Sequence, residues 1–320
     1  MPSVASVCET FRRLSEGVDS VVVGQKKVKE RLLVCLLAGG HALLEGVPGT
    51  AKTLLALVLS RLLGCRFRRI QFTPDLMPAD LVGTNIFNPK ANEFEFRPGP
   101  LFTDLLLADE INRTPPKTQS ALLEAMQEHA ATTDGVRREV SPVFTVLATQ
   151  NPVEFEGTYP LPEAQRDRFL MKIAIDYPEP ADETAMLSAY AAGRRLHDEA
   201  VEALTPVLSR EELLETRRAV AREVRAEKEV LEYIQKVVSA TRRDPSVQLG
   251  AGPRSGIALL ETSRALATLR GRDFVTPDDV KEMASPVLVH RVILTPEAEM
   301  EGTVLEDVLR RTFEQVEVPR

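Results

Sequence analysis

The chain has 320 residues, of which 43% are hydrophobic and 27% charged, a balance typical of soluble globular proteins with one large domain or a large and a small one. No run of eighteen apolar residues occurs, so a membrane span is not expected. The net charge of −7 argues against a broad nucleic-acid-binding surface, which usually carries excess Lys and Arg.

The cysteines and the N-terminal stretch indicate a cytoplasmic protein. Cys8, Cys35 and Cys65 are far apart and lack the spacing of a metal site, so we expect free thiols in a reducing compartment. The N-terminal stretch has no basic start followed by an apolar core, so a secretory signal is not expected.

The first half of the chain alternates short apolar runs with helical patterns, which predicts a parallel sheet covered by helices on both faces. Helices are expected at 52–64 and 115–130. The expected strands are short and rich in apolar residues, at 42–46, 67–72, 101–110, 143–151 and 169–176.

Two polar interruptions predict β-hairpins, one at Asn85–Gly99 and one around Asp134-Gly135. After about residue 176 the pattern becomes helical throughout. We therefore expect an α/β core at 1–180 and an all-α domain at 181–320. Its predicted helices have apolar residues every three or four positions, at 182–192, 209–222, 227–240, 256–269 and 277–288.

The stretch "GVPGTAKT" (46–53) lies between a predicted strand and a predicted helix and resembles the phosphate-binding loop G-x-x-x-x-G-K-[ST]. Its backbone N–H groups and the helix dipole favour phosphate, Lys52 adds a positive charge, and the Thr53 hydroxyl is suited to Mg²⁺. Ala51 stands where glycine is usual. We expect right-handed geometry there, with Gly46 and Gly49 in the strained turns.

Acidic and amide side chains follow two other predicted strands. Asp109 and Glu110 end a buried strand, where parallel pairing would deliver them beside the phosphate loop. Asp109 is suited to hold Mg²⁺ through water and Glu110 to polarise an attacking water. Asn151 ends the next strand and could orient water or contact phosphate, although Asn-Pro is also a common turn pair.

Several stretches together resemble the MoxR family of AAA+ ATPases, in the helix-2-insert group: "VVGQ", "GHALLEGVPGTAKT", "IQFTPDLMPADLVG", "LLLADEINR", "ATQNPVEFEGTYPLPEAQRDRF" and "GAGPRS". The resemblance covers most of the chain and includes Ala51, which is typical of the family. It implies a P-loop AAA+ core with a central parallel sheet in strand order 5-1-4-3-2, an all-α C-terminal lid, and ATP or ADP with Mg²⁺ as ligands.

The resemblance also implies roles for single residues. Asp109 and Glu110 correspond to the Walker B pair, Asn151 to sensor 1, Arg168 to an arginine finger that reaches a neighbouring subunit, and Arg254 to the sensor-2 arginine of the lid. Residues implied to contact the nucleotide are Val23, Gly24, Gln25, Gly46, Val47, Pro48, Gly49, Thr50, Ala51, Lys52, Thr53 and Leu54, with Thr53 and Asp109 at the metal.

Departures from the family pattern leave two points open. Arg166 stands where an apolar residue is usual, so either Arg166 or Arg168 could be the finger. Gly252 and Ser255 replace the more usual serine and alanine of the lid motif. His41 and His290 invite a catalytic interpretation, but the apolar residues around both favour structural roles.

Three functions are compatible with a nucleotide-binding protein of this kind. The resemblance implies an ATP-driven remodelling or maturation factor that forms a ring, typically a hexamer, and acts on a protein client, in some cases a von Willebrand factor A domain protein. A chelatase-type subunit is a near variant that the short "TVLATQNP" region disfavours. The alternatives are a DNA-acting motor, which the acidic composition disfavours, and a nucleotide-gated scaffold, which the intact Lys52, Asp109 and Glu110 disfavour.

Overall fold

The structure, a computed structural model, describes residues 2–47, 49–151, 157–193 and 198–319. At its centre is a five-stranded sheet in the order β2-β5-β8-β1-β9, in which every neighbouring pair is parallel. Its strands are β1 (Ala42–Gly46), β2 (Phe67–Gln71), β5 (Leu105–Asp109), β8 (Thr145–Gln150) and β9 (Met171–Ile175).

The predicted strand order is confirmed. When the five strands are numbered along the chain, the sheet reads 5-1-4-3-2. β1 lies beside β8, and β8 lies beside β5, so the loops that leave their carboxyl ends emerge next to one another. The phosphate loop after β1, Asp109 at the end of β5 and Asn151 after β8 therefore share one edge of the sheet.

Alternate residues of the central strands pack into two separate apolar clusters, one on each face of the sheet. Leu44, Leu107 and Leu147 belong to the cluster that contains α2 and α3, whereas Leu43 and Leu106 belong to the cluster that contains α5. The continuous apolar runs recognised in the sequence are thus buried on both faces, as expected of parallel strands. The helices of these two layers are α1 (Val4–Val21), α2 (Lys26–Ala38), α3 (Lys52–Leu62), α4 (Pro78–Val82), η1 (Ile111–Arg113), α5 (Pro116–Glu128) and α6 (Glu163–Arg166).

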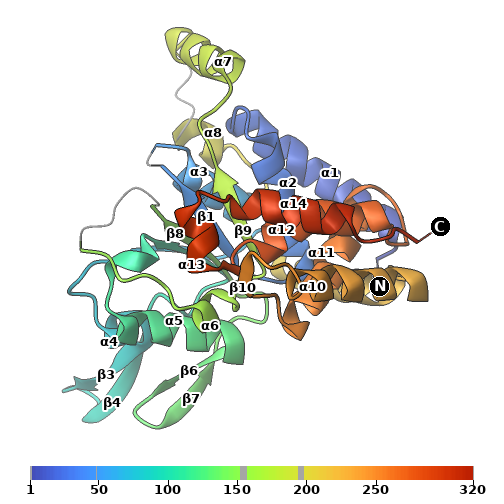
Figure 1. Cartoon of the computed structure of the whole chain (residues 1–320). Helices are drawn as coiled ribbons and strands as arrows, with labels where there is room; N and C mark the ends of the chain where they lie inside the picture. The colour runs from blue at the N-terminus through green and yellow to red at the C-terminus, as the bar shows by residue number, and fades with distance from the viewer. Residues whose placement is uncertain (1, 48, 152–156, 194–197, 320) are drawn as a thin grey trace.

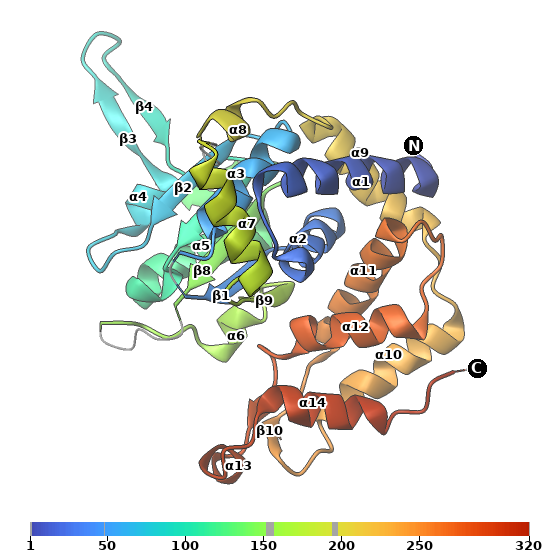
Figure 2. The same cartoon turned by 90° about the horizontal axis from the view of Figure 1, so that it is seen from above.

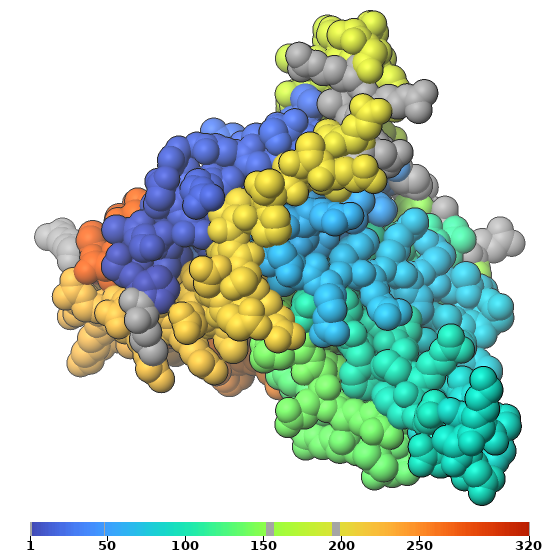
Figure 3. All heavy atoms as spheres, turned by 180° about the vertical axis from the view of Figure 1, so that it is seen from behind, coloured from blue at the N-terminus to red at the C-terminus, as the bar shows by residue number. Residues whose placement is uncertain are grey.

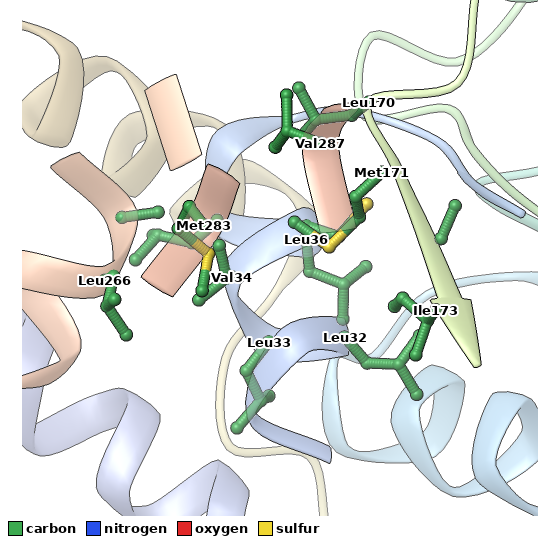
Figure 4. Close-up of a cluster of buried hydrophobic side chains, with 14 of the residues drawn as sticks. Leu32, Leu33, Val34, Leu36, Leu170, Met171, Ile173, Leu266, Met283 and Val287 are labelled. Carbon is green, nitrogen blue, oxygen red and sulfur yellow. The ribbon is translucent and has the colours of Figure 1, made fainter. Parts of the chain in front are cut away.

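The C-terminal helices pack on the same side of the sheet as α1 and α2 (Figures 1 and 2). Figure 4 shows α2 between β9 on one side and the C-terminal helices on the other, with Leu36 near Met171 and Val34 near Met283. The helices after β9 are α7 (Pro180–Ala191), α8 (Asp198–Glu202), α9 (Arg210–Glu223), α10 (Lys228–Thr241), α11 (Pro253–Leu269), α12 (Pro277–Leu288), α13 (Pro296–Met300) and α14 (Leu305–Glu314).

The C-terminal region is largely helical, as predicted, but it is not purely helical. Two short strands, β10 (Val247–Leu249) and β11 (Ile293–Leu294), pair antiparallel between the helices. Such short runs have no clear period of two, so the sequence pattern could not separate them from loops.

Two hairpins project from the core beside α4 and α5 (Figures 1 and 3). The first, β3 (Gly83–Asn88) with β4 (Glu93–Pro98), occupies the predicted 85–99 region, and its exposed tip carries Phe87 stacked edge-on against Phe94. The second, β6 (Ala130–Thr133) with β7 (Val136–Glu139), turns at Asp134-Gly135, where both residues have positive φ. The Asn85 side chain donates to Asp134 at 2.6 Å and joins the two hairpins.

Within the described ranges no helix combines the length and apolarity needed to cross a membrane. The three cysteines are free; Cys35 is buried, and burial raises the pKa of its thiol to about 12.

Candidate nucleotide-binding site

A cavity of about 600 Å³ lies at the edge of the sheet where β1, β5 and β8 end. The phosphate loop, the start of α3, the ends of β2, β5 and β8, and the segment before α2 contribute to its wall. The lining residues are Val21, Val22, Val23, Gln25, Gly49, Thr50, Ala51, Lys52, Thr53, Leu54, Leu57, Arg69, Gln71, Asp109, Glu110, Thr149, Gln150, Asn151, Pro178 and Met186.

The backbone of the phosphate loop differs from the prediction at Ala51 and at Gly46. Ala51 has φ 61°, so the prediction of right-handed geometry is wrong, and the strained turns fall at Gly49 (φ 84°) and Ala51. Gly46 is needed for another reason, because a Cβ there would lie 2.4 Å from the carbonyl oxygen of Ile175 on β9. Pro48 lies outside the described residues.

Replacing Ala51 by glycine tests the left-handed geometry. Because an L-residue other than glycine costs about 1 kcal/mol in this conformation, Ala51→Gly should raise the unfolding free energy by up to that amount. ATP affinity should change by less than about threefold, since the loop amides and Lys52 remain. Urea denaturation and fluorescent-nucleotide titration measure the two effects. Ala51→Val is the opposite control, because a β-branched residue at positive φ should destabilise the loop. A strong loss of binding with glycine would instead give the methyl group a packing role.

The Lys52 side chain is held by backbone carbonyl groups of the phosphate loop. Its Nζ donates to the carbonyl oxygens of Gly46 at 2.6 Å and Val47 at 2.9 Å. Burial lowers the pKa of Lys52 below its usual value, although the nearby carboxylates of Asp109 and Glu110 partly offset this by favouring the charged ammonium. A partly desolvated ammonium at the phosphate loop, where α3 begins, is an arrangement that attracts a polyphosphate.

Asp109 and Glu110 face the same cavity and are held by hydrogen bonds. Thr149 of β8 donates its hydroxyl to Asp109 Oδ1 at 2.6 Å and accepts from the Glu110 backbone N–H at 2.8 Å. Gln71 of β2 donates to Glu110 Oε2 at 2.5 Å, and Arg113 lies 3.2 Å from the same oxygen. Glu110 has φ 57°, a strained conformation that turns the chain sharply after β5.

The donor set fits a magnesium ion bound together with nucleotide phosphates. Thr53 and Asp109 line one cavity with Lys52, and a hydroxyl plus a carboxylate is what Mg²⁺ takes from a protein when phosphates and water complete its shell. Among the described residues there is no group of three or more His, Cys, Asp or Glu able to hold a metal by themselves.

Two cavity residues on β2 were not foreseen as site residues. Arg69 Nη2 donates to Asp109 Oδ2 at 2.7 Å, and Gln71 reaches Glu110, so both acidic residues have a partner on the neighbouring strand. Register explains the placement, since Gln71 pairs with Asp109 and Arg69 lies two residues earlier on the same face. Two polar residues two positions apart in "FRRIQ", Arg69 and Gln71, were the available signal, since they share one face of a predicted strand.

Residues before α2 and after β8 contribute to the same cavity. Val23 and Gln25 line the cavity, and Gln25 donates to the Asp176 carbonyl at 2.7 Å. Gly24 has φ 69°, and a Cβ there would meet the Asp182 carboxylate at 2.3 Å. Asn151 is buried at the end of β8 and faces the cavity.

The two arginines expected at the site do not line this cavity. Arg254, at the start of α11, lies 3.5 Å from the Asp167 carboxylate. Arg168 lies in a shallow recess beside Glu124 and Glu128 of α5, and no described residue forms an ion pair with it. Arg166 is 3.8 Å from Glu163 of its own helix. None of the three arginines is therefore among the residues that line the cavity of their own chain.

The two histidines of interest do not line the cavity either. His41 is buried and accepts from the Val146 N–H at Nδ1 (3.0 Å), so Nε2 carries the proton that it donates to the Met126 carbonyl (3.2 Å). His290 is buried against the Phe169 carbonyl. Burial lowers the pKa of His41 to about 4 and that of His290 well below its usual value.

A pH dependence of stability follows from His41. Between its ordinary pKa of 6.5 and the folded value of about 4, the unfolded chain binds a proton that the folded chain excludes. The unfolding free energy should therefore fall by about 3 kcal/mol as pH drops through this window. His41→Asn should be less stable at pH 7 but should lose less stability on acidification. Urea denaturation at several pH values measures both slopes, and equal slopes would show that His41 is not the group responsible.

Comparisons with known proteins identify the family. A model described as "ATPase family associated with various cellular activities (AAA)" matches residues 41–171, and an "AAA lid domain" model matches 239–312. The chain is 48% identical over 304 residues to the uncharacterized protein YeaC of Bacillus subtilis, covering 95% of this chain and 93% of the relative. It is 42% identical to Chaperone MoxR1 of Mycobacterium tuberculosis, covering 99% and 84%.

A solved structure supports the same relationship. The crystal structure of a proposed ATPase from Cytophaga hutchinsonii superposes with a TM-score of 0.89 at 40% identity, covering 98% of this chain and 96% of that one. The sheet order, the phosphate loop and these relatives agree, and the chain belongs to the MoxR family of AAA+ ATPases.

Proposed function

We propose that the protein binds Mg²⁺-ATP in the cavity at the end of β1 and hydrolyses it to ADP and phosphate. The observation that supports this best is the convergence of Lys52, Asp109, Glu110 and Asn151 on one cavity, from the start of α3 and the ends of β5 and β8. An anion-binding loop next to a carboxylate pair is the arrangement that phosphoryl transfer to water requires.

The side chains divide the chemistry among them. Lys52 and the loop amides bind the phosphates, and Thr53 and Asp109 would hold the magnesium ion, which neutralises charge on the phosphates when bound. Glu110 polarises the attacking water, and Asn151 orients it. Val23 and Gln25 line the cavity together with Pro178 and Met186 of α7, and the proposal gives Val23, Gly24 and Gln25 the contacts with adenine.

The arginines are proposed to act on the nucleotide of a neighbouring subunit. Arg168 and Arg254 lie outside their own cavity, and a guanidinium has to reach the γ-phosphate to stabilise its developing charge. In a ring, typically a hexamer, the surface that carries Arg168 and Arg254 (the arginine face) would lie against the nucleotide cavity of the neighbouring subunit. Arg168 is taken as the finger, as the resemblance implies, and Arg166, 3.8 Å from Glu163, is the alternative.

A protein client is the proposed target of the ATP-driven movement. Chaperone MoxR1 is named as a chaperone, and the β3–β4 hairpin of this chain presents Phe94 with 71% of its surface exposed. An exposed aromatic pair on a projecting hairpin is suited to contact a polypeptide. We also propose that the client is a von Willebrand factor A domain protein and that the protein acts in the cytoplasm.

Sedimentation of the purified chain with and without a slowly hydrolysed ATP analogue tests the proposal that nucleotide sites lie between subunits. The ring proposal predicts faster sedimentation with the analogue and Mg²⁺, and Arg168→Ala should weaken this assembly. Nucleotide binding without any change in sedimentation would contradict it.

The DNA-motor alternative predicts a different result. The hairpin tips carry Lys90, Arg137 and Arg138 but also Glu93 and Glu95, so no concentrated basic surface is present there. Salt-sensitive binding of the chain to DNA, with ATPase activity stimulated by it, would favour this alternative over a protein client.

A further inference from the structure

The segment Asp167–Leu170, which joins α6 to β9 and carries Arg168, rests on the C-terminal helices. Three side chains from α11 and from just after α12 hold it: Arg254, His290 and Arg291. Their partners are mostly backbone carbonyl oxygens of the segment. The backbone that bears the proposed finger is therefore fixed by the lid, although Arg168 itself belongs to the core.

Arg291 makes most of these contacts. Its guanidinium donates from Nε to Asp167 Oδ1 at 2.8 Å, from Nη2 to the Phe169 carbonyl at 2.6 Å and from Nη1 to the Leu170 carbonyl at 3.0 Å. It also donates to the carbonyls of Asp167, at 3.3 Å, and of Val287 in α12. With 3% of its side chain exposed, Arg291 is a buried cation that uses its whole fork of donors.

Arg254 contacts the same carboxylate in a very different way. It lies 3.5 Å from Asp167 Oδ2, and 56% of its side chain is exposed. Such a long, exposed ion pair contributes little and is easily exchanged. Asp167 thus has one permanent partner, Arg291 on Oδ1, and one replaceable partner, Arg254 on Oδ2.

Apolar packing continues the same contact. Leu170 lies near Val287 of α12, and Met171 lies near Leu36 of α2 (Figure 4). Moving the segment away from the C-terminal helices would be costly, since it would leave the buried guanidinium of Arg291 without acceptors.

We infer that Arg291 and Asp167 form a clamp that positions Arg168 for a neighbouring subunit's site. Asp167 also holds the Arg254 side chain close to this clamp. Arg291 and Asp167 are both positioning residues. A movement of α12 would be transmitted directly to the finger, and Arg254 would leave Asp167 when a neighbour's phosphates offer a stronger partner. This inference rests on the proposed function, in which both arginines act between subunits.

Mixtures of two inactive chains test the clamp. An acceptor chain carries Arg168→Ala and keeps its own cavity, and a donor chain carries Lys52→Ala and keeps its arginines. Neither should hydrolyse ATP well alone, but a mixture should recover activity where a donor's arginine face meets an acceptor's cavity. Arg291→Met is then placed either in the donor or in the acceptor.

The clamp predicts an asymmetric result. In the donor, Arg291→Met should reduce the recovered activity by at least ~10-fold, since a misplaced finger loses part of an effect of ~10³ or more. In the acceptor, it should change the recovered activity by less than about twofold, because the acceptor's arginine face is not used. Equal loss in both positions, or no loss in either, would overturn the clamp and leave Arg291 with a structural role.

Two further variants make the test decisive. Arg272→Met breaks another lid ion pair, 2.6 Å from Asp279, that does not touch the segment, and it should show no asymmetry. Asp167→Asn keeps the backbone carbonyls and the side-chain size, so it should fold even if Arg291→Met does not, and it should show the donor-specific loss. If the parent mixture recovers no activity, the proposal of sites shared between subunits fails, and the clamp fails with it.

Discussion

Glu110→Gln should lower steady-state ATP hydrolysis by at least ~100-fold while leaving ATP binding nearly unchanged, because general-base catalysis contributes about 10²–10⁴. The amide fills the same space and can still contact Gln71 and Arg113, whose partner atom in the wild type is Glu110 Oε2. It cannot take a proton from water. Phosphate release and fluorescent-nucleotide titration of the variant separate the two effects.

Glu45→Gln is the matched control. Glu45 is in β1, one residue before the loop, and its partners are Gln150 and Lys172, but it does not line the cavity. The same isosteric change there should alter hydrolysis by a few-fold at most. Unchanged hydrolysis in Glu110→Gln would remove Glu110 from the chemistry and leave the nucleotide-gated scaffold as the better description.

Lys52→Ala should weaken ATP binding by about 100-fold or more, since a charge-assisted contact to phosphate contributes about 3 kcal/mol in a partly buried site. The lost ammonium is the one that donates to the loop carbonyls of Gly46 and Val47. Isothermal titration with ATP and Mg²⁺ measures the effect directly.

Lys26→Ala provides the comparison for charge alone. Lys26 is exposed at the start of α2, next to Gln25, and does not line the cavity. Its removal changes the net charge equally and should have little effect on affinity. If both variants bind ATP like the wild type, the phosphate loop is not the nucleotide site.

The sheet and the phosphate loop could be predicted because their signals are local. Apolar runs of strand length ended at Gly46 and Asp109, and the helical pattern began at Lys52. Parallel strands put all their carboxyl ends on one edge, so the assembly of the cavity follows once the strand order is known.

The placement of Arg69 and Arg254 could not be predicted, because each depends on contacts distant in sequence. The positive φ of Ala51 did have a local signal, since the phosphate-loop pattern has glycine at that position, and the prediction of right-handed geometry did not use it. Arg69 reaches Asp109 only through the pairing of β2 with β5, forty residues apart. Arg254 follows the packing of α11 on α1 and α2, which turns its helix start toward Asp167.

The dependence of ATP turnover on protein concentration tests the shared-site proposal most directly. If Arg168 and Arg254 complete a neighbour's cavity, phosphate release per chain should rise with concentration to a plateau as subunits associate, and Arg168→Ala should lower that plateau by ~10³ or more. A turnover per chain that is constant from the most dilute to the most concentrated solution, and unaffected by Arg168→Ala, would show that each chain hydrolyses ATP by itself and would contradict the proposal.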